Sequence, residues 1–168
     1  KANFFKKIIY TFLYRPSFKF VFNKFKVKNR RLNVKAIIEK QLDQPFKGKI
    51  HQIEHHLAHL ASTFFVSPFK NSSILSVDGF GDFSSTMWGL GNENKIKIDK
   101  KVTFPHSLGI FYEALTQWLG FSNYGDEYKV MGLAPYGNLE YTNQLSQLIL
   151  SKKDGTFELN LKFFRHHL

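Results

Sequence analysis

The stretch Ser73-Ile74-Leu75-Ser76-Val77-Asp78-Gly79, followed by Phe80-Gly81-Asp82, decides how this chain folds. Its nearly continuous apolar run is typical of a strand at the buried centre of a sheet. Residues 84–90 then alternate in polarity, and turn residues at 91–94 lead into a second alternating run at 95–98. Together these segments predict a three-stranded meander with glycine-rich corners.

The elements around this meander are predicted to be mostly helical, because their apolar residues recur every three or four positions. The predicted helices cover residues 5–13, a stretch from Ser17, 31–44, 54–65, 108–119, part of 123–137, and 139–151. Short strands are predicted at residues 49–53 and 157–161. The chain therefore reads as an α/β protein.

The segment Glu54-His55-His56-Leu57-Ala58-His59 holds three of the seven histidines. On a helix, His55 and His59 lie one turn apart on one face, so their imidazoles can reach one metal ion. His56 points about 100° away from His55 and cannot easily join them. Paired histidines on a helix are also common as surface or packing residues, and the spacing alone leaves both interpretations open.

The corner Asp78-Gly79-Phe80-Gly81-Asp82 joins two predicted strands. Glycine lets backbone N–H groups approach a phosphate closely, and a carboxylate can orient a metal-bound water or a substrate hydroxyl. Phosphate-binding hairpins of the actin and sugar-kinase type are similar to this arrangement. An Asp-Gly turn between strands is equally an ordinary hairpin.

Two further positions carry side chains that can bind or catalyse, Lys129 and His106. Lys129 follows the carboxylates of Asp126 and Glu127 and could neutralise a phosphate or carboxylate, or could form a surface ion pair at a helix start. His106 could be a general base, a substrate ligand or a buried hydrogen-bonded residue. The sequence does not decide among these roles.

Composition bounds the class of protein. The 168 residues, with 43% hydrophobic and 17% aromatic content, suit a globular domain of ordinary size. Because there is no cysteine, disulfides and thiolate metal ligands are excluded, and a reducing compartment is compatible. The chain begins with Lys1 and is read here as a fragment of a longer protein.

The positive charge is concentrated at the N-terminus, where residues 1–38 carry eleven Lys or Arg and no acidic residue. We expect a basic, Phe-rich helical segment at 1–45 and part of a larger domain at 46–168. A basic amphipathic helix could lie on an anionic membrane or a phosphate backbone. The interpretation favoured here is a pair of helices that pack Phe and Ile inward. No apolar run reaches the roughly 18 residues of a membrane span.

Three sequence motifs follow one another along the chain: residues 55–65, residues 76–82, and residues 104–109 together with 127–137. Together they resemble the O-carbamoyltransferases of nodulation-factor and antibiotic biosynthesis, such as nodulation protein U and the cephalosporin and tobramycin carbamoyltransferases. The resemblance implies an actin-like, ribonuclease-H-like α/β fold, with a mixed sheet flanked by helices.

The resemblance also implies a reaction. Carbamoyl phosphate and ATP would give a carbamoyl adenylate, and the carbamoyl group would then move to a hydroxyl of a small-molecule acceptor. A third metal ligand, expected to be a carboxylate, would lie C-terminal to this chain, so the fragment alone is expected to be inactive. The resemblance implies that His55 and His59 are ligands of an iron-type divalent metal. It implies contacts to the nucleotide and carbamoyl group from Asp78, Gly79, Gly81, Glu127 and Lys129. The catalytic residues that it implies are Asp78, Lys129 and His106.

Two alternatives accompany this interpretation. One is a tRNA threonylcarbamoyladenosine synthase-like enzyme of the same fold, which the basic N-terminus would suit but the block at 127–137 favours less. The other is a non-enzymatic nucleic-acid or membrane-surface binder that uses residues 1–35. The preferred expectation is a cytoplasmic biosynthetic enzyme without nucleic-acid partner or transmembrane segment, with a homodimer left open.

Overall fold

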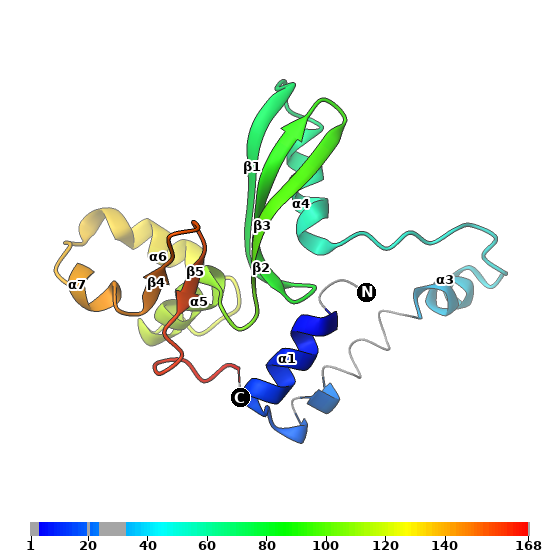
Figure 1. Cartoon of the computed structure of the whole chain (residues 1–168). Coiled ribbons are helices and arrows are strands. Elements are labelled where there is room, and N and C mark those ends of the chain that lie inside the picture. Colours follow the sequence, from blue (N-terminus) through cyan, green and yellow to red (C-terminus); the bar gives the residue numbers. More distant parts are fainter. Residues whose placement is uncertain (1–3, 20, 24–32, 168) are drawn as a thin grey trace. The chain divides into compact units, whose positions relative to one another are not determined.

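The structure is a computed structural model that describes residues 4–19, 21–23 and 33–167 (Figure 1). The chain divides into two units, one with residues 3–53 and 167–168, the other with residues 54–166. Each unit is described by itself below. The domain boundary predicted near residue 45 stays a prediction.

The first unit contains α1 (Phe4–Tyr14), helical residues at 18–19 and 21–23, and α3 (Val34–Leu42). Helix α1 packs through Tyr10, which is buried and donates its hydroxyl hydrogen to the His167 carbonyl. Burial, with a smaller contribution from Tyr14, raises the pKa of Tyr10 to about 12. The contact face of α1 is therefore formed by its tyrosines.

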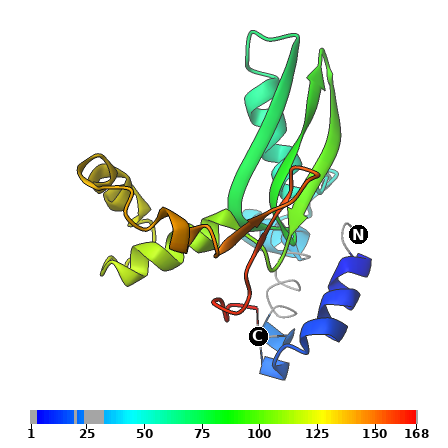
Figure 2. The ribbon, with the colours of Figure 1, turned by 60° about the vertical axis from the view of Figure 1, so that its left-hand side comes forward.

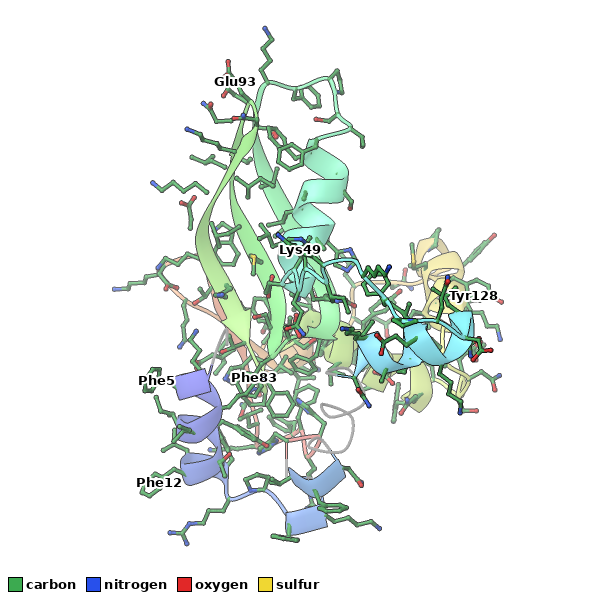
Figure 3. The ribbon with its side chains drawn as sticks, turned by 90° about the vertical axis from the view of Figure 1, so that its right-hand side faces the viewer. Phe5, Phe12, Lys49, Phe83, Glu93 and Tyr128 are labelled. Atoms are coloured by element: carbon green, nitrogen blue, oxygen red, sulfur yellow. The ribbon has the colours of Figure 1, made fainter. Side chains whose placement is uncertain are left out.

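The apolar face of α1 is exposed, which makes the predicted inward packing of its Phe and Ile side chains wrong in the described residues. Phe5 and Phe12 are both 78% exposed, and Figure 3 shows their side chains directed away from the helix. The residues of this exposed face are Phe5, Ile8, Ile9, Phe12 and Leu13. The physical reason is helical geometry, because Tyr10 lies about 160° around the helix from Phe12.

The second unit is built on a three-stranded antiparallel sheet in the order β1-β2-β3. Its strands are β1 (Asn71–Gly81), β2 (Ser84–Asn92) and β3 (Lys95–Thr103), which confirms the predicted meander. Regular pairing of β1 with β2 ends at Val77↔Thr86 and resumes at Gly81↔Ser84. Residues 78–80 therefore lie where the ladder is irregular, a setting in which a β-strand can redirect side chains.

Strand β1 is an edge strand of this sheet, so the predicted burial on both faces is wrong within the described residues. Ile74 and Ser76 are buried, whereas Leu75 and Val77 are 66% and 49% exposed. The reason is that successive side chains of a strand point to opposite faces, and α4 (His55–Phe64) packs on β1 and β2 (Figures 1 and 2). Helix α4 confirms the helix predicted at 54–65.

The core between α4 and the sheet consists of Leu60, Phe64, Ile74 and Met87. Leu60 is 1% exposed and Met87 is 2% exposed. This packing holds the N-terminal end of α4 beside the end of β1, where the candidate site lies.

We expect Leu60→Ala to lower the free energy of unfolding by about 2–5 kcal/mol, because it removes a buried side chain and leaves a cavity. Urea denaturation of the purified protein measures this loss. Leu139→Ala is the control, since Leu139 is 92% exposed and its removal should cost less than about 0.5 kcal/mol. Equal losses in the two variants would show that this core does not hold α4 on the sheet.

The remaining elements of the second unit are α5 (Leu108–Trp118), α6 (Glu127–Leu133), η1 (Ala134–Tyr136), α7 (Thr142–Leu145), β4 (Ile149–Ser151) and β5 (Phe157–Leu159). The predicted helix at 139–151 is wrong, because α7 is four residues long and Ile149 pairs with Leu159 in a β4–β5 ladder. The strand predicted at 49–53 is also wrong, since no described strand pairs with these residues. Of the described helices, none has the length and apolar character to cross a bilayer.

Candidate metal centre

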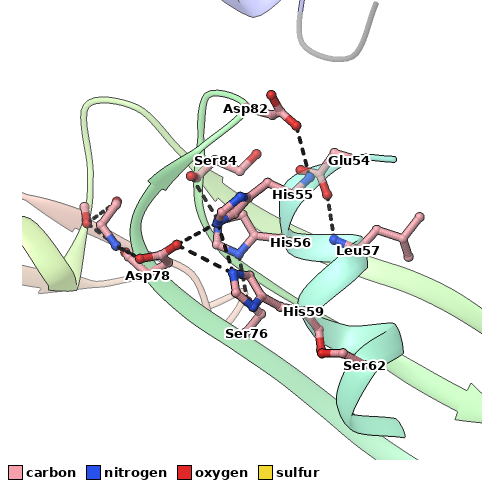
Figure 4. Close-up of polar contacts among 12 residues, drawn as sticks. Glu54, His55, His56, Leu57, His59, Ser62, Ser76, Asp78, Asp82 and Ser84 are labelled. Atoms are coloured by element: carbon pink, nitrogen blue, oxygen red, sulfur yellow. Dashed lines mark hydrogen bonds and ion pairs between the residues drawn. The ribbon is translucent and has the colours of Figure 1, made fainter. Parts of the chain in front are cut away.

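His55, His59 and Asp78 bring three potential metal-ligand atoms together where α4 meets the end of β1 (Figure 4). His55 Nε2 lies 2.7 Å from Asp78 Oδ2 and 3.0 Å from His59 Nε2. His59 Nε2 lies 3.8 Å from the same carboxylate oxygen. The two histidines come from one face of α4, as their spacing predicts, and Asp78 reaches them from the irregular end of β1.

This donor set fits a divalent transition metal. Two imidazoles and one carboxylate that leave other positions open are typical of non-haem iron(II) sites, and zinc accepts the same ligands. The three side chains are 40%, 53% and 42% exposed, so the site is open on one side. Asp78 is a candidate carboxylate ligand within this chain. The ligand expected C-terminal to this chain stays a prediction.

The hydrogen bond from His55 holds the pKa of Asp78 below its ordinary value of 3.8. Partial burial acts in the opposite direction, and the Gly79 N–H, 2.6 Å from Asp78 Oδ1, lowers the pKa further. Asp78 is therefore ionised at neutral pH, the state that a cation requires of a carboxylate ligand.

A lowered folded-state pKa gives Asp78 a defined effect on stability. Ionised Asp78 stabilises the fold at pH values above its ordinary pKa of 3.8, and this contribution disappears as pH falls through the lowered folded pKa. We expect metal-free Asp78→Asn to be less stable than the wild type at pH 6, by less than about 1 kcal/mol because the pair is solvent-screened. Urea denaturation at pH 6 and pH 3 tests this, and a difference that does not shrink at pH 3 would contradict it.

Gly81 is required by the close approach of His55. A Cβ atom added at Gly81 would lie 1.9 Å from His55 Cδ2, so any side chain would displace the imidazole. The next residue, Asp82, accepts the His55 backbone N–H at 3.0 Å. Glu54 caps the same helix end by accepting the Leu57 N–H at 2.7 Å. The structure thus assigns Gly81 a packing role, and its predicted nucleotide contact stays a prediction.

Gly79 lies beside the first turn of α5 and differs from Gly81 in its surroundings. Ser107 is fully buried, donates its hydroxyl hydrogen to the Gly79 carbonyl at 2.7 Å and accepts the Ile110 N–H at 3.2 Å. A Cβ at Gly109 would lie 2.7 Å from Gly79 N, so α5 approaches the β1 backbone closely. Sequence analysis missed Ser107 and Gly109 as site-supporting residues, although a serine before a helix is a signal for an N-cap.

His106 lies against the β4–β5 ladder. Its Nδ1 accepts the Leu159 backbone N–H at 3.1 Å, and its Nε2 is 4.0 Å from Glu158 Oε1. His106 is half-buried, and its bond to a backbone N–H is a structural role, the role of a buried hydrogen-bonded histidine. Its predicted catalytic role stays a prediction.

Lys129 and Asp126 form an ion pair, with Nζ 2.7 Å from Oδ1. This bond lowers the pKa of Asp126 and raises the pKa of Lys129. Glu127, the first residue of α6, uses its carbonyl to accept a 3.5 Å contact from the Tyr112 hydroxyl. The structure therefore assigns Lys129 the ion-pair role, and the nucleotide contacts predicted for Glu127 and Lys129 stay predictions.

Comparison with known proteins places the chain among its relatives. The family described as Carbamoyltransferase N-terminus matches residues 7–168. An uncharacterized protein of Synechocystis is 38% identical over 143 residues, which cover 81% of this chain and 23% of that protein. Nodulation protein NolNO of Sinorhizobium fredii is 40% identical over 114 residues, which cover 64% of this chain and 16% of that protein.

A second nodulation protein, NolO of Bradyrhizobium diazoefficiens, is 41% identical over 112 residues, 65% of this chain and 20% of that protein. The chain thus spans 16–23% of the length of these relatives. The family match includes α4 with its histidines, the β1 strand that ends at Asp78, and α6. On the strength of a match that covers residues 7–168, this chain belongs to the carbamoyltransferase N-terminus family.

Proposed function

We propose that this chain supplies the metal centre and part of the nucleotide site of an ATP-dependent O-carbamoyltransferase with an actin-like fold. The observation that carries the proposal is the convergence of His55 Nε2, His59 Nε2 and Asp78 Oδ2 within 4.8 Å of one another. Family membership supports the carbamoyl chemistry, and the two-histidine, one-carboxylate donor set supports iron(II) as the metal.

The proposed reaction has two transfers. Water first hydrolyses carbamoyl phosphate to carbamate and inorganic phosphate. A carbamate oxygen then attacks the α-phosphorus of ATP, pyrophosphate leaves, and carbamoyl adenylate is formed. The acceptor hydroxyl then attacks the carbamoyl carbon, AMP leaves, and the hydroxyl proton passes to a base or to water. Both steps gather negative charge around phosphate oxygens and need a polarised carbonyl.

In this proposal, residues of this chain hold a metal ion that would stabilise the phosphate charge and polarise the carbonyl. The metal, when bound, would supply positive charge to phosphate oxygens and polarise the carbonyl. His55 and His59 hold two nitrogen donors on one helix face, and ionised Asp78 holds an oxygen donor beside them. Gly79 leaves open space next to these donors, since no atom lies within 4 Å of a Cβ placed there. A nucleotide could therefore approach the backbone at this point.

Mass spectrometry of the full-length protein tests the proposal. The protein is incubated with ATP, carbamoyl phosphate and ferrous iron, without acceptor, and the expected product is carbamoyl adenylate. The product should be lost in His55→Ala and retained in His51→Ala, an exposed histidine outside the cluster. No adenylate from folded, metal-loaded wild-type protein would overturn the proposed function.

The exposed apolar face of α1 supports a second candidate, binding of an anionic membrane or nucleic acid through residues 1–35. Phe5 and Phe12 are exposed, and residues 1–38 carry eleven cations without an acidic residue. Such binding would weaken steeply with salt and would persist in His55→Ala. Vesicle and oligonucleotide binding at two salt concentrations measures it, and salt-independent binding would contradict it.

A further inference from the structure

We propose that His56, which the metal does not contact, is the residue that positions both metal-binding imidazoles by fixing α4 on β1 and β2. The inference rests on the proposed metal centre and assigns a role to the third histidine of the cluster. Sequence spacing only excluded His56 from the ligand face of the helix. The structure shows what its side chain does there.

The His56 ring is fully buried, and both of its nitrogens have partners. Nδ1 lies 2.9 Å from Ser76 Oγ on β1, and Nε2 lies 3.0 Å from the Ser84 carbonyl oxygen on β2 (Figure 4). One side chain therefore connects the first turn of α4 to two neighbouring strands. The connection is polar and directional, unlike the apolar contacts of Leu60 and Phe64 one and two turns further along the same helix face.

The partners assign the tautomer of His56. A carbonyl oxygen can only accept, so Nε2 carries the hydrogen and donates it to Ser84. In the tautomer with its hydrogen on Nε2, Nδ1 accepts the Ser76 hydroxyl hydrogen. Because neither nitrogen is left over, His56 cannot bind a metal without breaking a buried hydrogen bond, an unfavourable exchange in a dry environment.

The same ring lies against both proposed ligands. The centroid of the His56 ring is 5.4 Å from that of His55 and 6.3 Å from that of His59, with edge-to-face geometry in both pairs. Its partner Ser76 lies two residues before Asp78 on β1, on the strand that carries the carboxylate donor. The His56–Ser76 bond thus sets the rotation of the helix that bears two donors against the strand that bears the third.

Loss of either His56 hydrogen bond, to Ser76 or to Ser84, should weaken metal binding more than it weakens the fold. Outer groups that orient metal ligands typically change metal affinity by about 10- to 100-fold when removed. We expect His56→Asn, whose Oδ1 can still accept from Ser76 but which cannot reach Ser84, to lower affinity for Zn²⁺ by about tenfold. Ser76→Ala removes the other bond and should have an effect of the same order.

The matched control is Leu60→Val, which perturbs the same buried face of α4 without touching a histidine. We expect it to reduce thermal stability as the His56 variants do, while its affinity for Zn²⁺ stays within about twofold of the wild type. Calorimetric titration of the full-length protein with Zn²⁺, a redox-inert stand-in for iron(II), supplies the affinities. A purely structural role for His56 would give equal affinity losses in His56→Asn and Leu60→Val.

A second measurement needs no variant. Ring ¹⁵N spectra of metal-free wild type should show His56 protonated on Nε2 only, and addition of Zn²⁺ should shift the ring nitrogens of His55 and His59 but not of His56. A zinc-induced shift of a His56 nitrogen to a metal-bound position would overturn the inference. So would wild-type zinc affinity in His56→Asn, and neither outcome would affect the proposed function.

If the proposed metal centre itself is wrong, the zinc titrations and the ring spectra give a different result. In that case the wild type and His55→Ala would bind Zn²⁺ equally weakly, and the ring spectra of His55 and His59 would not respond to zinc. This result would overturn both the metal centre and the positioning role that rests on it.

Discussion

His55→Ala is expected to lower the affinity of the full-length protein for Fe²⁺ by about a hundredfold or more, and His59→Ala should do the same. Each substitution removes one of three donors whose atoms lie within 4.8 Å of one another. The His55 imidazole also donates to Asp78 at 2.7 Å, so its loss leaves this carboxylate without its nearest side-chain partner. Anaerobic equilibrium titration with Fe²⁺ measures the effect.

His51→Ala is the matched control for this experiment, because His51 is exposed and lies outside the ligand cluster. Its affinity for Fe²⁺ should equal that of the wild type. The free energy of unfolding without metal should change little in His59→Ala, whose side chain is 53% exposed. An affinity loss of less than about fivefold in both His55→Ala and His59→Ala would exclude the cluster as the metal site.

The second large effect is expected at Gly81. The Cβ of Gly81→Ala would lie 1.9 Å from His55 Cδ2 and 2.1 Å from Cγ, so the imidazole must move away from Asp78 and His59. We expect metal affinity to fall by about tenfold or more, with an overpacking cost of about 1–3 kcal/mol in the free energy of unfolding. Metal titration and urea denaturation of the same samples measure the two quantities.

Gly79→Ala is the control for Gly81→Ala, two residues earlier on the same strand. No atom lies within 4 Å of its added Cβ, so fold and metal affinity should be retained. If a nucleotide approaches the backbone at Gly79, as proposed, ATP affinity should fall in this variant while metal affinity does not. Equal metal affinity in the two variants would show that the close approach at Gly81 is not needed for the site.

Apolar periodicity along the chain was sufficient to predict the helices and strands whose partners lie close in sequence. The helix at 54–65, the helix at 108–119 and the three-stranded meander were predicted from apolar spacing and turn residues, and α4, α5 and β1–β3 confirm them. In the structure, side chains cap both helix starts, since Glu54 accepts the Leu57 N–H and Ser107 accepts the Ile110 N–H.

The wrong predictions of secondary structure and burial arose where a contact with another segment of the chain decides the conformation. Residues 139–151 have helical periodicity, but Ile149 pairs with Leu159, which is buried, so strand pairing prevails over the local pattern. Residues 49–53 look like a strand but have no described partner strand. The apolar face of α1 was predicted to be buried, and instead Tyr10 supplies the contact.

The sequence by itself determined that His55 and His59 lie side by side, because an i, i+4 spacing places two residues on one face of any helix. Only the tertiary structure decided that the Asp78 carboxylate lies beside this histidine pair and that His56 is buried against β1 and β2. Asp78 lies 23 residues from His55, and it reaches the imidazole because the core around Leu60 and Met87 fixes α4 on β1 and β2. A long-range contact of this kind depends on how side chains fill the space between elements, which spacing along a chain does not encode.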